Sequence, residues 1–165
     1  MKKVMLFFTT LMILSACTPK LEKRLKSEMV AAPTSQVQID KNLILQYAID
    51  NELDVQSTPS GIYYAIENYG TGDERPDKNS KITAHYHGTL LNGDIFDSSV
   101  DRGEPLKFDL GKVIKGWQEA IPMLGKGGKG QFFIPSKMAY GSRAIGDVIP
   151  ANAVLVFDIE LLDFK

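Results

Sequence analysis

Apolar and polar side chains alternate from Lys81 to Leu91, which is the pattern of a β-strand with one buried face and one face in water. Tyr86 falls among the apolar positions of this strand, so its ring is expected to point inward. Shorter apolar runs at residues 62–66, 131–134 and 153–162 predict three more strands. The chain therefore reads first as a sheet-forming sequence.

A helical pattern replaces this alternation at residues 114–124, where apolar residues recur at intervals of three and four. Trp117 lies on the apolar side of this short helix and is expected at the centre of the core. Pro122 should end or kink the helix. Many strands and one central helix predict an α+β domain.

Length and charge fit one globular domain with an N-terminal extension. The 165 residues, 44% of them hydrophobic, can bury one sizeable core and hardly two. A formal net charge of −1 gives no electrostatic reason to expect nucleic acid as a partner.

The N-terminus has the pattern of an export signal. Two lysines precede an apolar run at residues 4–14, which is too short to cross a bilayer as a stable helix. Residues 14–17, Leu-Ser-Ala-Cys, resemble the bacterial lipobox, in which the cysteine is lipidated and becomes the first mature residue. We therefore predict a lipoprotein signal peptide over residues 1–16 and a lipid on Cys17, the only cysteine. The alternative is a cysteine that happens to lie near an ordinary cleavage site.

Two further segments precede the domain. Residues 17–38 are polar and contain prolines, so they are predicted to form a flexible, lipid-anchored tether, although three leucine and methionine residues spaced by four also fit a short amphipathic helix. Asp40 is positioned to cap a helix that runs through Leu53. We expect this helical extension, residues 39–60, to dock on its own domain, residues 61–165.

The side chains that usually carry covalent, acid–base or metal catalysis do not form a recognisable group. His85 and His87 lie side by side on the polar face of the first strand, a spacing that binds a metal only when further ligands are near. Without a cysteine cluster we expect a solvated sheet face there, no metal and no cofactor. The chemistry that remains available is that of an aromatic pocket.

Three short segments in fixed order give the chain a family resemblance. They are Phe96-Asp97-Ser98-Ser99, then Val113-Ile114-Lys115-Gly116-Trp117, then Ala139-Tyr140-Gly141 with Val148-Ile149-Pro150 close behind. From about Gly61 to Lys165 the chain resembles an FKBP-type peptidyl-prolyl isomerase. The resemblance implies an antiparallel sheet of about five strands wrapped around the short central helix, and an enzyme that accelerates rotation about X-Pro bonds.

Transferred residue by residue, the resemblance also implies a pocket whose floor is Trp117. The implied catalytic residues are Asp97, Tyr140, Tyr86 and Phe96, and the implied substrate-binding residues are Phe108, Val113, Ile114, Trp117, Ile149, Phe157 and Arg102. Ile114 would donate to a substrate carbonyl through its backbone N–H and Tyr140 through its phenol, while Asp97 would lie beside the reacting amide. Arg102 resembles the family's arginine that holds this aspartate and a tyrosine in place.

Each of these residues also has a plainer interpretation, since any one aromatic could belong to ordinary core packing and Asp97 could cap a turn with the two serines that follow it. The sequence departs from the family at Leu106, where many members carry an aromatic residue, and at Ile145, which replaces a histidine of the best-known eukaryotic members. One residue is also missing before Val113. These departures lie at the rim of the implied pocket, so they bear on ligand preference more than on activity. We expect rapamycin-like macrolides to bind, but less tightly.

The leading hypothesis is a membrane-tethered prolyl isomerase that acts on proline-containing polypeptides and accelerates the folding of exported proteins. A non-catalytic binding module or chaperone that holds extended segments in the same groove is the alternative, and an accessory role in an envelope assembly is a third. A lipid on Cys17 would place the protein in the bacterial cell envelope, facing the periplasm or the cell surface. Thr18, which avoids the aspartate of inner-membrane retention in enteric bacteria, favours the outer membrane.

Overall fold

The computed structural model describes residues 18–165. The predicted signal peptide and the predicted lipid on Cys17 lie outside the described residues. Among the helices of residues 18–165, none combines the length and the hydropathy that a membrane crossing requires.

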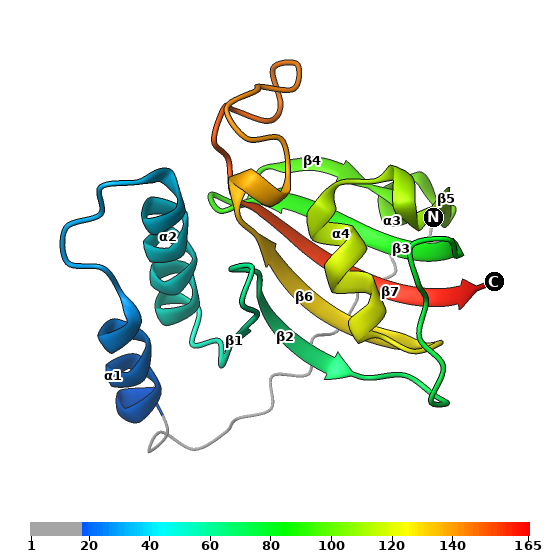
Figure 1. The fold of residues 1–165 in the computed structure, drawn as a ribbon, viewed down its shortest axis with the longest axis horizontal. Helices are drawn as coiled ribbons and strands as arrows, with labels where there is room; N and C mark the ends of the chain where they lie inside the picture. The colour runs from blue at the N-terminus through cyan, green and yellow to red at the C-terminus, as the bar shows by residue number, and fades with distance from the viewer. Residues whose placement is uncertain (1–17) are drawn as a thin grey trace, which may run out of the picture.

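One antiparallel sheet of seven strands forms the body of the domain (Figure 1). Its strands, in spatial order, are β1 (Gln56–Ser57), β2 (Tyr63–Asn68), β6 (Gly128–Ile134), β7 (Leu155–Phe164), β3 (Lys81–Leu90) and β4 (Ile95–Ser98), and β5 (Leu106–Asp109) also pairs with β3. The two ten-residue strands β3 and β7 pair along the middle. The predicted α+β class is confirmed. The sheet has seven strands instead of about five, because strands as short as β1, β4 and β5, with two to four residues each, leave little pattern in the sequence.

The central helix α4 (Lys115–Ala120) packs across one face of this sheet. A Cβ atom at Gly116 would lie 2.3 Å from Cγ2 of Ile134 on β6, so glycine is what allows the helix to approach the sheet so closely. The helix stops before Pro122, which lies in the 3₁₀ turn η2 (Ile121–Met123). Trp117 is buried in the resulting core, as the sequence predicts.

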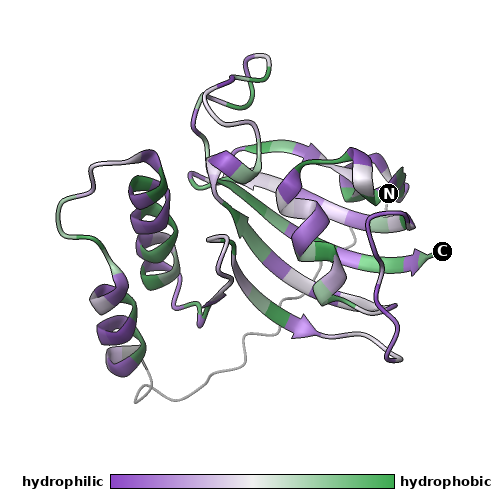
Figure 2. Ribbon diagram, in the orientation of Figure 1, coloured by the Kyte–Doolittle hydropathy of each residue, from purple (hydrophilic) through white to green (hydrophobic). Residues whose placement is uncertain are grey.

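A second core lies on the opposite face of the sheet, where α1 (Thr18–Glu28) and α2 (Gln36–Asp50) pack. Neighbouring residues of a strand point to opposite faces, so Phe132 belongs to the α4 core while Phe133 contacts the helices. The Phe133 ring centre lies 5.5 Å from that of Tyr47 on α2. Figure 2 shows hydrophobic and hydrophilic residues side by side along both helices, as expected for helices with one buried side.

The structure corrects two predictions about this extension. Residues 18–28 form a helix instead of a flexible tether, because the apolar residues spaced by four make a stripe whose middle member, Leu25, is fully buried. Helix α2 is capped by Ser35 and not by Asp40. The Ser35 side chain accepts a hydrogen bond from the Gln38 amide, so the cap lies five residues earlier than predicted and the helix begins at Gln36. Asp40 lies inside the helix and is fully buried.

Candidate active site

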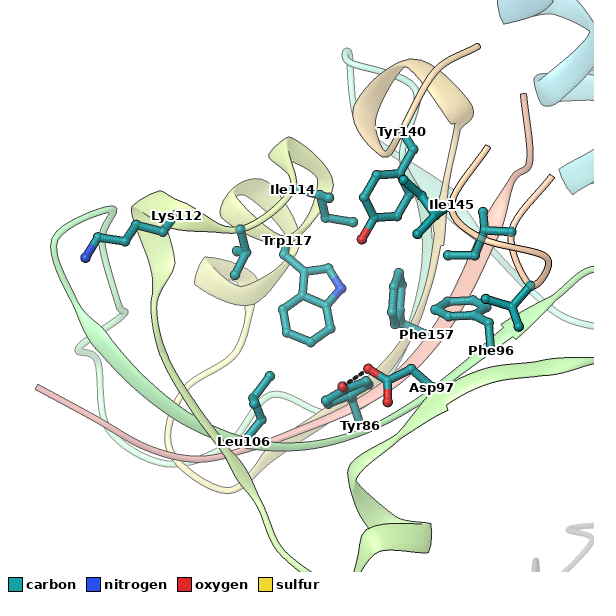
Figure 3. A pocket seen from close by; sticks show the side chains of 13 residues that line it. Tyr86, Phe96, Asp97, Leu106, Lys112, Ile114, Trp117, Tyr140, Ile145 and Phe157 are labelled. Atoms are coloured by element: carbon teal, nitrogen blue, oxygen red, sulfur yellow. Dashed lines mark hydrogen bonds between the residues drawn. The ribbon is translucent and has the colours of Figure 1, made fainter. Parts of the chain in front are cut away.

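A pocket of about 510 Å³ opens between α4, the central strands and the segment that follows β6 (Figure 3). Its lining is mostly apolar and consists of Tyr86, Phe96, Asp97, Leu106, Lys112, Val113, Ile114, Trp117, Tyr140, Ile145, Val148, Ile149 and Phe157. The structure therefore brings together the residues that the sequence assigned to the pocket, with the exception of Phe108 and of Arg102, which lies beside it.

Aromatic rings form the floor and the walls of this pocket. The Trp117 ring centre lies 5.1 Å from that of Tyr86 and 5.1 Å from that of Phe157, both in edge-on arrangements. Phe96 contacts Phe157 edge-on at 5.4 Å. Edge-to-face packing is the arrangement that aromatic pairs favour, and it holds the rings rigidly around the cavity.

Gly88 on β3 leaves room for two of these rings. A Cβ atom at this position would lie 2.7 Å from Cζ of Phe96 and 3.1 Å from Cε1 of Phe157. Because glycine has no side chain, the Phe96 and Phe157 rings can pack directly against the backbone of β3 at this position.

The indole N–H of Trp117 is buried and has no hydrogen-bond partner within residues 18–165. Figure 3 shows the indole nitrogen turned toward the side of the pocket that Tyr140 and Phe157 occupy. Buried donors are normally paired, so this N–H is available to a ligand or a water molecule in the pocket.

Asp97 is fixed by two donors at the edge of the pocket. Its carboxylate accepts one hydrogen bond from the Tyr86 hydroxyl and another, as an ion pair, from the Arg102 guanidinium. Arg102 Nη2 also donates to the Tyr86 oxygen at 3.0 Å, which closes a triangle of three side chains. The guanidinium carbon lies 5.7 Å from the centre of the Tyr86 ring.

The short helix α3 (Ser99–Arg102) explains this geometry, because it returns the chain toward β3 directly after β4. The Ser98 side chain caps α3 by accepting from the Asp101 amide, and Gly103 ends it with a positive φ of 77°. Ser99 Oγ accepts from the Tyr86 amide at 2.8 Å, so the helix is fastened to the strand that carries Tyr86.

The protonation states of the triangle follow from these contacts. Burial alone would raise the pKa of Asp97, but the hydrogen bonds from Tyr86 and Arg102 and the charge of Arg102 outweigh it and lower the pKa. Burial raises the pKa of Tyr86, and the hydrogen bond to Asp97 raises it further. At neutral pH the site therefore contains an ionised carboxylate and a neutral phenol.

Ile114 and Tyr140 present donors at the mouth of the pocket. Ile114 caps α4, and its carbonyl accepts from the amides of Trp117 and Gln118, whereas its own N–H bonds no backbone acceptor within residues 18–165. Tyr140 is 40% exposed, and Figure 3 shows its hydroxyl pointing into the cavity.

Phe108 corrects the prediction. Its ring lies 5.2 Å from Trp117, but it lines a separate surface pocket together with Ile82. The register of β5 on β3 explains the difference, because Phe108 is opposite Ile82 while Leu106 is opposite Ala84, two residues closer to Tyr86. Leu106 therefore lines the pocket over Trp117. It is one of the positions at which the sequence departs from the family.

Sequence reasoning did not assign the other lining residues Lys112 and Val148 to the pocket, and it named Ile145 only as a departure from the family at the rim. The last two lie on the segment after Tyr140, where Ile145 and Ile149 pair as a β-bridge, so their positions depend on a turn that periodicity does not reveal.

The two histidines lie on the opposite face of the sheet and support α3. His85 Nδ1 lies 3.0 Å from Ser99 Oγ, and His87 Nδ1 lies 3.0 Å from Ser98 Oγ, so both rings are half-buried and not simply solvated. In the part of the chain that the structure describes, no group of three or more His, Cys, Asp or Glu side chains is arranged to hold a metal ion.

The comparison with known families defines the class of protein. The family described as FKBP-type peptidyl-prolyl cis-trans isomerase matches residues 72–162, which include strands β3 to β6, most of β7, helix α4 and the whole pocket. The chain belongs to this family.

Individual relatives agree with this assignment. FKBP-type peptidyl-prolyl cis-trans isomerase FkpA of Buchnera aphidicola (subspecies Schizaphis graminum) is 43% identical over 157 residues, which make up 92% of this chain and 61% of the relative. The crystal structure of FkpA from Escherichia coli matches with a TM-score of 0.70 and 37% identity, over 89% of this chain and 63% of that chain.

A crystal structure of a peptidyl-prolyl cis-trans isomerase from Pseudomonas syringae matches with a TM-score of 0.68 and 33% identity, over 82% of this chain and 98% of that one. The chain thus spans 61% of the Buchnera relative but nearly the whole of the Pseudomonas structure.

Proposed function

We propose that this chain is a peptidyl-prolyl cis-trans isomerase that acts on X-Pro bonds of polypeptides. The observation that carries the proposal is the apolar, aromatic pocket over Trp117, with an ionised Asp97 fixed at its edge by Tyr86 and Arg102. Family membership and the similarity of the fold to a solved peptidyl-prolyl cis-trans isomerase support it.

The chemistry needs no nucleophile. The X-Pro imide has partial double-bond character and a rotation barrier of about 18–20 kcal/mol, and its planar ground state is more polar than the twisted transition state. A pocket that replaces water by aromatic rings around the imide therefore destabilises the planar form relative to the twisted one. The proline ring itself is apolar and fits such a surface.

Polar groups at the rim would add binding that is stronger in the transition state. The Ile114 N–H and the Tyr140 hydroxyl can hold the carbonyls of the substrate backbone while the imide rotates. Asp97 is held in place by the two hydrogen bonds that it accepts, so its charge is positioned to interact with the carbonyl carbon as resonance is lost.

The direct test is catalysis of isomerisation in short X-Pro peptides, followed by a protease-coupled assay or by NMR exchange. We expect Asp97→Val and Tyr140→Phe each to lower kcat/KM by about tenfold, which corresponds to about 1.4 kcal/mol of transition-state stabilisation. Asp73→Val, on an exposed loop away from the pocket, is the matched control and should leave kcat/KM unchanged. A folded wild type that does not catalyse would favour the binding-module or chaperone alternative.

We further propose that rapamycin-like macrolides bind in this pocket. Its volume of about 510 Å³ and its apolar lining support this, and Leu106 in place of an aromatic residue should weaken the contact. Calorimetry should show binding that Trp117→Leu weakens. The absence of binding at high micromolar macrolide would contradict the proposal.

Membrane attachment is a separate proposal that rests on sequence. The lipobox-like residues 14–17 support a lipid on Cys17, and Thr18 after it supports the outer membrane of a bacterial envelope over the inner one. Anchored in this way, the enzyme would act on exported proteins while they fold, since slow X-Pro isomerisation also limits folding outside the cytoplasm.

A further inference from the structure

Besides the apolar core between the helical extension and the sheet, one buried carboxylate links the extension to the domain. Asp40 on α2 is fully buried, and its Oδ2 accepts hydrogen bonds from the backbone N–H of Ser136 at 2.8 Å and from the Ser136 hydroxyl at 2.6 Å. Its Oδ1 accepts from Gln36 Nε2 at 2.6 Å. Burying a carboxyl group is costly unless such partners are in place, so this contact fixes α2 to one particular point of the domain.

That point is the start of the segment that carries Tyr140. Ser136 opens the turn η3 (Ser136–Met138), and its carbonyl accepts from the amides of Ala139 at 3.0 Å and of Gly141 at 2.8 Å. The residues on both sides of Tyr140 are therefore hydrogen-bonded to the residue that Asp40 holds.

The far end of the same segment also rests on α2. The Asn152 amide donates to the Gly141 carbonyl at 2.8 Å, which ties the two ends of the loop together. Val154, just beyond, is buried in a cluster with Ile44 and Leu45 of α2. Figure 1 shows α2 beside the end of the sheet from which this loop emerges.

We propose that Asp40 is a positioning residue for the isomerase site, acting through Ser136 on the Tyr140 hydroxyl. No residue of α2 lines the pocket, but through this contact α2 would help to hold the Tyr140 hydroxyl in position. The physical reason is that a misplacement of about 1 Å in a group that contacts the substrate can cost as much as 10²-fold in rate. This inference rests on the proposed function.

The test is a double-mutant cycle on the full chain, with kcat/KM measured for an X-Pro peptide. The four proteins are the wild type, Asp40→Ala, Tyr140→Phe and the double variant. We expect Asp40→Ala to lower kcat/KM by about fivefold, and Tyr140→Phe to have little further effect in its presence, since directly coupled positions are strongly non-additive. Amide hydrogen exchange at residues 139–141 should become faster in Asp40→Ala.

A purely structural role for Asp40 would give a different pattern. The variant would melt at a lower temperature, but at an assay temperature where it is folded its kcat/KM would equal that of the wild type, or its effect would add to that of Tyr140→Phe. Either result would overturn the inference while leaving the proposed function intact. A wild type without catalysis would overturn both.

Two variants guard against failure to fold. Ser136→Ala removes the hydroxyl but keeps the backbone N–H for Asp40, and Asp40→Asn keeps the shape of the side chain, so both should show the same coupling to Tyr140→Phe at smaller size. Asp50→Ala is the matched control, because Asp50 lies exposed on the same helix and accepts only from Gln46. It should leave kcat/KM unchanged.

Discussion

Asp97 lies between a phenol and a guanidinium, and both favour its ionised form. Because its pKa in the folded protein is lowered, the contacts stabilise the fold at pH values above the ordinary carboxyl range and lose this effect as the pH falls through the lowered pKa. We expect an NMR titration of the Asp97 carboxyl to give a midpoint below about 3.9, the usual aspartate value.

Removal of the guanidinium should move that midpoint upward. Arg102→Leu leaves the Tyr86 hydrogen bond but takes away the positive charge, so the pKa of Asp97 should rise. Arg24→Leu, which removes a surface ion pair with Asp54, is the control and should not shift the midpoint. An unchanged midpoint in Arg102→Leu would mean that the ion pair does not form in solution.

Gly88→Ala tests the packing of the pocket wall against the backbone of β3. Its added methyl group would meet the Phe96 and Phe157 rings, so both must shift, and we expect kcat/KM for an X-Pro peptide to fall by about tenfold, equal to about 1.4 kcal/mol. Thr89→Ala on the same strand is the control. If Gly88→Ala is folded and fully active, the exact placement of these rings does not matter for catalysis.

The sequence could predict most of the pocket because the residues come in ordered local motifs, such as Phe96-Asp97 and Ile114 to Trp117. It could not separate Phe108 from Leu106, since both point to the same face of β5 and only the register on β3 decides which one reaches the cavity. The sequence also could not predict the hydrogen bonds between Ser136 and Asp40, because these residues are 96 positions apart.

The burial of Leu25 is the main apolar contact that docks helix α1 on the rest of the molecule. Leu25 is fully buried against α2 and the sheet, whereas the exposed face of α1 carries charged residues. Leu25→Ala should lower the free energy of unfolding by about 2–5 kcal/mol, as measured by urea denaturation. Lys23→Ala, on the exposed face, should change it by less than about 0.5 kcal/mol. Similar values for both variants would mean that α1 is not docked.

Long elements were easier to predict than short ones. Strands β3 and β7 each show ten residues of clear pattern, but β1 has two residues and takes its extended form only by pairing with β2. The start of α2 was misplaced because Ser35 and Asp40 are both good capping residues. Only the packed structure shows that Asp40 is needed elsewhere.

Attachment to a membrane can be tested on the whole protein. Cys17→Ala should either release the protein into the soluble fraction or leave it unprocessed, because the acyl chains would otherwise contribute about 0.8 kcal/mol for each buried methylene. Detergent partitioning and mass spectrometry would measure both effects. Cys17→Ala that is processed and still partitions into detergent like the wild type would contradict the lipid anchor. Thr18→Ala is the neighbouring control.

The docking of α1 has a consequence for where such an enzyme could work. Thr18 is already part of a helix whose Leu25 is packed into the molecule, so there is no slack between residue 18 and the domain. With a lipid anchor at residue 17, no flexible linker would separate the domain from the membrane, so the domain would stay at the bilayer surface. It would search for clients by lateral diffusion in the plane of the bilayer, and would meet those that emerge at the membrane before those that have already drifted away from it.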